Sequence, residues 1–131
     1  MNDIAKKILV VDDDLNFLSH AVPFLQNAGY AVTTAETQAD AEKLIAGEAF
    51  DAGLFNLGLE YPDSGFALCY HAKKLAKPFP IVMLTAANSW VEFEFNLASP
   101  SSRRWIKADA YLEKPVRMEQ IETELEHLLR K

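Results

Sequence analysis

The sequence is poor in the residues on which several classes of protein depend. Its 131 residues include a single cysteine, Cys69, so no internal disulfide can form and nothing indicates an oxidising compartment. Cys69 itself is expected to be a small buried hydrophobic residue. The three histidines share neither a spacing nor a predicted strand end. This scatter argues against a histidine metal site or a catalytic histidine.

Excess positive charge and long apolar runs are also lacking. The formal net charge is −6 at pH 7, whereas non-specific binding to nucleic acid or to an anionic membrane requires a basic surface. No apolar run is long enough to span a bilayer, and the first residues lack the apolar region of a signal peptide. We therefore expect a cytoplasmic protein that binds neither nucleic acid nor membrane.

The sequence does contain a regular alternation of apolar runs and amphipathic segments. This alternation is typical of repeated strand and helix units around a parallel sheet that is covered on both faces. The length, with 50% apolar and 24% charged residues, suits one globular domain. Because no linker or repeat interrupts the pattern, a single domain over residues 1–131 is expected.

Periodicity and capping signals predict five strands and at least four helices. The strands are expected at residues 8–11, 30–34, 52–55, 80–85 and 110–113. The helices are expected at 15–28, from the capping-box sequence 37–40 onward, from Asp63 or Ser64 to 72, and at 118–129. Gly29 is a plausible stop for the first helix, and Pro23 should kink or weaken it.

The segment between the fourth and fifth strands has two interpretations. Apolar residues from Val91 to Leu97 alternate with polar ones, which favours a strand, whereas Trp90, Phe93 and Leu97 recur at helical spacing. We expect a helix, because five strands are already assigned. A second short helix is expected to begin at Ser99-Pro100, a serine cap followed by proline.

Polar side chains gather where predicted strands end. Three aspartates, Asp12, Asp13 and Asp14, follow the first strand, and Asn56 follows the third. Thr85 ends the fourth strand and Lys114 follows the fifth. The carboxyl ends of parallel strands meet at one edge of the sheet, so these residues are expected to form one site. Asp14 alone is better explained as a helix cap.

These residues resemble the receiver domain of two-component response regulators. The shared pattern is the apolar run 8–11 with its aspartates, then Thr85-Ala86, then the run 111–115 of sequence Tyr-Leu-Glu-Lys-Pro, and it covers essentially the whole chain. The resemblance implies a flavodoxin-like (βα)5 three-layer α/β sandwich with five helices and strand order 2-1-3-4-5. The spacing from Thr85 to Lys114 is longer than the family usually has, so an enlarged and irregular fourth-helix region is expected in this chain.

The resemblance also implies a metal site. Asp12 and Asp13 would hold a divalent ion, and the Gly58 carbonyl and the Asn56 side chain would complete the set. Oxygen ligands of this kind suit Mg²⁺.

A phosphoryl-binding site is implied beside the metal. Lys114 would neutralise the phosphoryl oxygens, Thr85 would bind them through its hydroxyl, and Tyr111 would change rotamer with them. The Lys114-Pro115 peptide is a candidate cis bond.

Asn56 departs from the receiver pattern, because the phosphoryl acceptor is expected to be an aspartate. The amide nitrogen lone pair is delocalised, so it cannot attack as a carboxylate does. One negative charge is also missing, and a charge pair at ~4 Å and a dielectric constant of ~20 is worth about 4 kcal/mol before solvation. Weakened Mg²⁺ binding is expected. Glu60 replaces the usual proline nearby, which favours natural divergence over a laboratory substitution.

The sequence therefore predicts a receiver-like signalling domain that is not an enzyme and not phosphorylated at Asn56. It would act by binding proteins, such as a histidine kinase or a downstream signalling protein. Self-association into a homodimer is also compatible with this interpretation. One alternative is an ordinary receiver with an engineered Asn56 or with Asp13 or Asp63 as substitute acceptor. A remote alternative, a flavodoxin-like FMN protein, conflicts with three carboxylates at the phosphate position.

Overall fold

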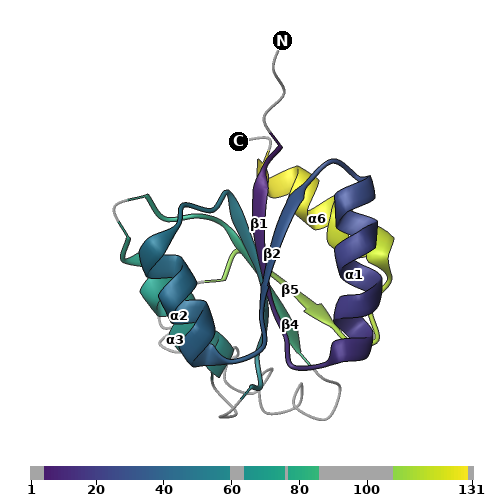
Figure 1. The fold of residues 1–131 in the computed structure, drawn as a ribbon. Helices are drawn as coiled ribbons and strands as arrows, with labels where there is room; N and C mark the ends of the chain where they lie inside the picture. Colours follow the sequence, from purple (N-terminus) through teal and green to yellow (C-terminus); the bar gives the residue numbers. More distant parts are fainter. Residues whose placement is uncertain (1–4, 60–63, 76, 86–107, 130–131) are drawn as a thin grey trace.

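The computed structural model describes residues 5–59, 64–75, 77–85 and 108–129. From the first strand to the fourth, strands and helices alternate along the chain, as the sequence predicts (Figure 1). In order they are β1 (Lys7–Val11), α1 (Leu15–Asn27), β2 (Ala31–Ala35), α2 (Gln38–Gly47), β3 (Ala52–Asn56), α3 (Ser64–Lys73), β4 (Ile81–Thr85), β5 (Ala110–Glu113) and α6 (Met118–Leu129).

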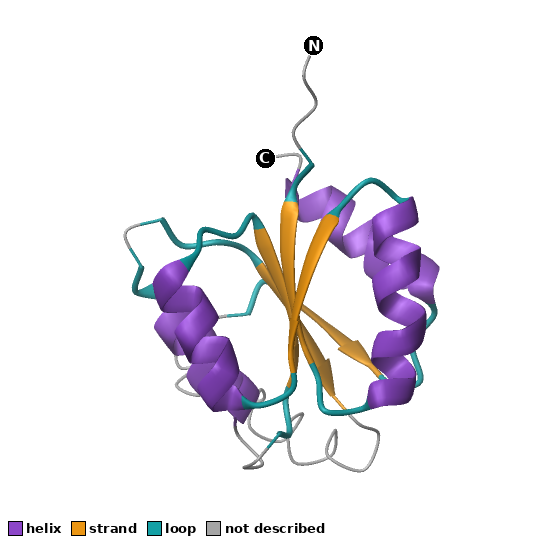
Figure 2. Ribbon diagram, in the orientation of Figure 1, coloured by secondary structure: helices purple, strands orange, loops and turns teal. Residues whose placement is uncertain are grey.

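The strands form one parallel sheet in the order β2-β1-β3-β4-β5. Helices α2 and α3 cover one face of the sheet, and α1 and α6 cover the other (Figure 2). The strand order and the three layers confirm the predicted flavodoxin-like α/β fold. After β2 is added on one side of β1, the next strand, β3, is added on the other side. In sheets of this kind, ligand sites lie at the carboxyl ends of the strands where this change occurs.

The sheet separates two apolar layers. Along β1, Leu9 and Val11 belong to the layer beneath α2 and α3, whereas Ile8 and Val10 belong to the layer beneath α1 and α6. All four side chains are fully buried. A central strand covered on both faces needs apolar residues at consecutive positions, which explains why β1 reads as an unbroken apolar run.

Local signals fix the ends of several elements. Thr37 accepts a hydrogen bond from the Asp40 backbone N–H at 3.1 Å and caps α2, as predicted. Gly29 adopts a φ of 101°, a conformation that glycine tolerates best, and the chain turns there between α1 and β2. Pro23, where a kinked or weakened helix was expected, is exposed within α1, and the helix continues to Asn27.

Some predictions lie outside the described residues. These are the helix over residues 90–97, the short helix from Ser99-Pro100, the enlarged fourth-helix region and Asp63. The described part contains four of the five helices that the resemblance implies. Within that part, none of the helices combines the length and the apolar character needed to cross a bilayer.

Candidate functional site

The carboxyl ends of the central strands bring the predicted site residues together. Sheet register pairs Val11 with Phe55, Asn56 with Leu84, and Thr85 with Glu113. The residues that follow these pairs are therefore level with one another along one edge of the sheet. The sequence prediction that these strand ends converge is confirmed.

Asp12 is the buried centre of the site, with a side-chain exposure of 0%. Its Oδ2 accepts a hydrogen bond from Lys114 Nζ at 2.6 Å, and its Oδ1 accepts one from the Asp14 backbone N–H at 3.0 Å. Burial raises the pKa of Asp12, and the Lys114 ammonium and the Asp14 N–H oppose that rise. Both carboxylate oxygens are therefore engaged by groups of the chain itself.

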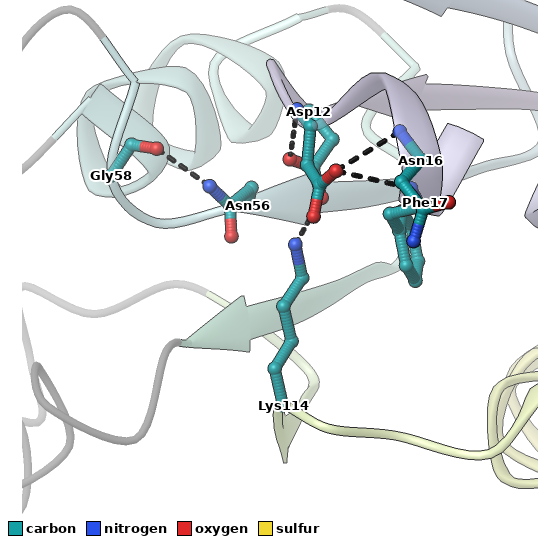
Figure 3. Close-up of polar contacts among 7 residues, drawn as sticks. Asp12, Asn16, Phe17, Asn56, Gly58 and Lys114 are labelled. Carbon is teal, nitrogen blue, oxygen red and sulfur yellow. Dashed lines mark hydrogen bonds and ion pairs between the residues drawn. The ribbon is translucent and has the colours of Figure 1, made fainter. Parts of the chain in front are cut away.

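Lys114 follows the end of β5, and its side chain extends from there to Asp12 (Figure 3). Its side chain is 19% exposed, and Nζ lies 4.5 Å from the centre of the Phe17 ring. The Lys114 backbone N–H donates to the Thr85 carbonyl at 2.7 Å, which ties the residue to the end of β4. The Lys114-Pro115 peptide bond is cis, as the resemblance implies. Backbone and side chain together hold the ammonium in the site.

Asn56 is the last residue of β3, and its amide group faces the turn that follows. Asn56 Nδ2 donates to the Gly58 carbonyl oxygen at 2.6 Å (Figure 3). An aspartate has no hydrogen to donate here, and its oxygen would face the carbonyl oxygen directly. The contact therefore depends on an amide at position 56.

The two remaining aspartates have different surroundings. Asp14 is the N-cap of α1, and its Oδ1 accepts from the backbone N–H groups of Asn16 at 3.0 Å and Phe17 at 3.2 Å. This confirms the capping interpretation of Asp14. Asp13 is exposed, and within the described part of the chain it has no hydrogen-bond or ion-pair partner. Among the described groups, none occupies this carboxylate in place of a ligand.

Thr85 and Tyr111 lie on neighbouring strands but differ in their polar contacts. Thr85 is fully buried, and its Oγ1 lacks a hydrogen-bond partner among the described residues. A buried hydroxyl without a partner is costly, and such a group is often explained by a ligand or water. Tyr111 packs against the apolar layer beneath α2 and α3. Burial, with smaller effects of Cys69 and Asp109, raises the pKa of Tyr111 to about 12.

Sequence reasoning missed two residues that shape the site. Phe17 lies under the Lys114 ammonium; its place in the first turn of α1, after the aspartates, was the available signal. Gly65 donates its backbone N–H to the Leu57 carbonyl at 2.7 Å. A Cβ on Gly65 would lie 2.6 Å from Leu57 Cα and 2.8 Å from the Asn56 carbonyl oxygen. Only glycine permits this approach of α3 to the end of β3.

The protein family described as "Response regulator receiver domain" matches residues 8–126, which is nearly the whole chain. The chain belongs to the response-regulator receiver family. It is 30% identical over 125 residues to the two-component response regulator PhoP of Pseudomonas aeruginosa, covering 95% of this chain and 52% of that protein. The receiver domain thus spans about half the length of the curated relatives it matches.

Solved structures share the fold. A putative response regulator from Chloroflexus aurantiacus is 25% identical, with a TM-score of 0.80 over 98% of this chain and 100% of that one. The receiver domain of sensor histidine kinase PA1611 from Pseudomonas aeruginosa is 21% identical, with a TM-score of 0.77 over 98% of this chain and 100% of that one. That domain was solved with a magnesium ion in its active site cleft.

The four predicted metal ligands are oxygen donors of the kind that Mg²⁺ prefers, but two of them already accept hydrogen bonds from other groups of this receiver domain. Asp12 accepts from Lys114 and Asp14, and the Gly58 carbonyl accepts from Asn56. Asp13 and the Asn56 amide oxygen remain. Within the described residues, no three His, Cys, Asp or Glu side chains are grouped to hold a metal ion. Asp12 and the Gly58 carbonyl are therefore hydrogen-bonded to groups of the chain itself at the positions where a metal ion would bind.

An open groove adjoins Lys114. It runs between the start of α1 and the loop from β5 to α6, and its lining includes Phe17, His20, Pro115 and Val116. Leu15, at the start of α1, is 63% exposed. The edge of the site therefore presents apolar surface next to its charged groups.

Proposed function

We propose that this receiver domain takes part in two-component signalling without accepting a phosphoryl group at residue 56. One observation carries the proposal: an amide, Asn56, stands at the carboxyl end of β3, on the strand beside the one that Asp12 follows. Phosphoryl transfer to a receiver requires a carboxylate oxygen that attacks phosphorus and forms an acyl phosphate. The amide offers no such nucleophile, because its nitrogen lone pair is delocalised into the carbonyl group.

The rest of the site is consistent with a phosphoryl-acceptor site that has lost its acceptor. Lys114 is a fixed cation, and the unpartnered Thr85 hydroxyl lies on the adjacent strand. Such groups would stabilise charge on a phosphoryl group if a nucleophile were present. Without one, the domain would work as a binding module and not as an enzyme.

Protein partners would then carry the signal. A histidine kinase or a downstream signalling protein is the expected class of partner, as for receiver domains in general. The apolar groove beside Lys114 supports this proposal, since its lining combines apolar side chains with the charged groups of the site. Partner binding would follow the abundance of the two proteins and would be independent of phosphorylation at position 56.

Intact-mass measurement after incubation with acetyl phosphate and Mg²⁺ tests the proposal. The wild-type protein is expected to keep its mass. Asn56→Asp is expected to gain one phosphoryl group in a Mg²⁺-dependent manner, because the substitution supplies the missing oxygen nucleophile. Asn56→Ala serves as the matched control that lacks both amide and carboxylate, and it should also keep its mass.

A substitute acceptor is the competing explanation, and exposed Asp13 is the described residue that favours it. A phosphoryl group gained by the wild-type protein would contradict a function as a binding module that accepts no phosphoryl group. Loss of that gain in Asp13→Asn, with Asn56→Ala still modified, would assign the chemistry to Asp13.

A further inference from the structure

Two side chains of the chain make the contacts that a divalent cation would make in this site. Lys114 Nζ lies 2.6 Å from Asp12 Oδ2, and Asn56 Nδ2 lies 2.6 Å from the Gly58 carbonyl oxygen. Each contact places a positively polarised hydrogen against an oxygen that the receiver resemblance assigns to the metal. We propose that Lys114 and Asn56 together replace the cation, so that the site is complete without metal. This inference rests on the proposed function, in which Asn56 occupies the acceptor position.

The Lys114 ammonium is positioned by contacts on several sides. It forms an ion pair with a carboxylate that is 0% exposed, and it lies 4.5 Å from the centre of the Phe17 ring. The backbone of the same residue is held by the Thr85 carbonyl at 2.7 Å. An exposed lysine would sample many rotamers, whereas these contacts fix one arrangement. A metal ion that approached Asp12 would have to displace this ammonium.

The Asn56 amide excludes the cation in a second way. Two unprotonated oxygens would repel each other at this short separation, whereas the Asn56 N–H group satisfies the Gly58 carbonyl directly. To offer its own oxygen to a metal together with that carbonyl, the Asn56 amide would have to rotate and give up this hydrogen bond. Asp13 alone remains as an unengaged carboxylate among the described site residues. One exposed carboxylate is a poor Mg²⁺ site, because the ion dehydrates reluctantly.

Thermal unfolding in MgCl₂, with KCl at matched ionic strength as the reference, tests the inference. The wild-type protein should show no Mg²⁺-specific rise in Tm. Lys114→Met should have a lower Tm in KCl, and MgCl₂ should restore part of it, because the freed Asp12 becomes a ligand. Its Mg²⁺ affinity by calorimetric titration should exceed that of the wild type on the order of tenfold, the size of change expected when a group that engages a ligand is altered.

Controls separate this effect from general electrostatics. Lys7→Met also removes a lysine from an ion pair, Lys7–Glu48 at 2.9 Å, but that pair is exposed and lies away from the site. It should gain no Mg²⁺ response. If Lys114→Met fails to fold, Asn56→Asp provides a second test. That variant removes the amide donor and adds a carboxylate, so MgCl₂ should raise its Tm, and the Asp14 amide resonance should shift as Mg²⁺ is added.

The inference and the proposed function can fail separately. A Mg²⁺-specific rise in wild-type Tm equal to that of Asn56→Asp would overturn the replacement of the cation, even if no phosphoryl group were accepted. A folded Lys114→Met protein that ignores Mg²⁺ would overturn it as well. Phosphoryl gain by the wild-type protein would instead contradict the proposed function.

Discussion

Asp12 is a buried carboxylate whose hydrogen-bond partners are supplied by the chain. The ammonium of Lys114 and the backbone N–H of Asp14 leave neither of its oxygens unpaired. A buried charge that loses its partner is strongly destabilising, so Lys114 favours the ionised form of Asp12 against the effect of burial. In this site the Lys114 ammonium and the Asn56 amide contact oxygens that a metal ion could otherwise bind.

Tyr111 gives a pH dependence with a definite sign. Burial raises its pKa from 10.0 to about 12, so the folded protein holds the phenol proton more tightly than the unfolded chain does. Below pH 10 the phenol is protonated in both states and stability is unaffected. Between pH 10 and 12 the unfolded state loses the proton first. The free energy of unfolding therefore falls as the pH rises through this range.

Ultraviolet absorbance titration of phenolate checks this prediction. The difference between the wild type and Tyr111→Phe should titrate near pH 12, over the range in which circular dichroism shows the protein still folded. A difference curve centred near pH 10 would show that Tyr111 is not shielded from water and would contradict the burial seen here.

The site residues were predictable from the sequence to the level of strand ends and no further. Apolar runs followed by Asp12, Asn56 and Lys114 place these residues at one edge of a parallel sheet. The contact between Lys114 and Asp12 depends on side-chain rotamers and on the turn after β5, which periodicity does not report. The hydrogen bond from Asn56 to Gly58 depends in the same way on the turn after β3. The roles of Asp13, Thr85 and Tyr111 toward a ligand stay predictions.

Helix starts control the geometry around the site. Helix α1 begins at Leu15 after its cap Asp14, two residues past Asp12, and α3 begins with Ser64 and Gly65 packed against the end of β3. The Asp14 cap was readable from the sequence, because an aspartate before an amphipathic segment is a local signal. The packing of Gly65 could not be predicted, because it depends on Leu57, eight positions earlier in the turn that follows β3.

Gly65→Ala is expected to destabilise the protein. The added methyl group would lie 2.6 Å from Leu57 Cα and 2.8 Å from both the Asn56 carbonyl oxygen and Met83 Sδ. Backbone atoms cannot move aside as a flexible side chain can, so α3 would have to shift away from β3. Overpacking of this kind costs about 1–3 kcal/mol in the free energy of unfolding, which urea denaturation measures.

Gly47→Ala is the matched control for this substitution. Gly47 ends α2, and no atom lies within 4 Å of the position of an added Cβ. Alanine favours the helical conformation, so this variant should keep or slightly raise the free energy of unfolding. Equal stability of the two variants would show that the close approach at Gly65 is not important for packing.

Across the whole molecule, the sheet carries the site at one edge and buries an apolar layer on each face. The parallel pairing and the positions of the described helices follow from the alternation of apolar runs with amphipathic segments, whereas the strand order was implied by the receiver resemblance. Alternation could not settle residues 90–97, because their apolar residues fit both periods. The fold therefore fixes where the strand ends meet, and individual side chains at those ends decide what the site can bind.

The most direct test of this account is a crystal structure of the wild-type protein grown in excess Mg²⁺. The account predicts Lys114 Nζ on Asp12 Oδ2, the Asn56 amide on the Gly58 carbonyl oxygen, and no ion between them. An ion coordinated by Asp13, Asn56 and the Gly58 carbonyl, with Lys114 moved away from Asp12, would contradict it.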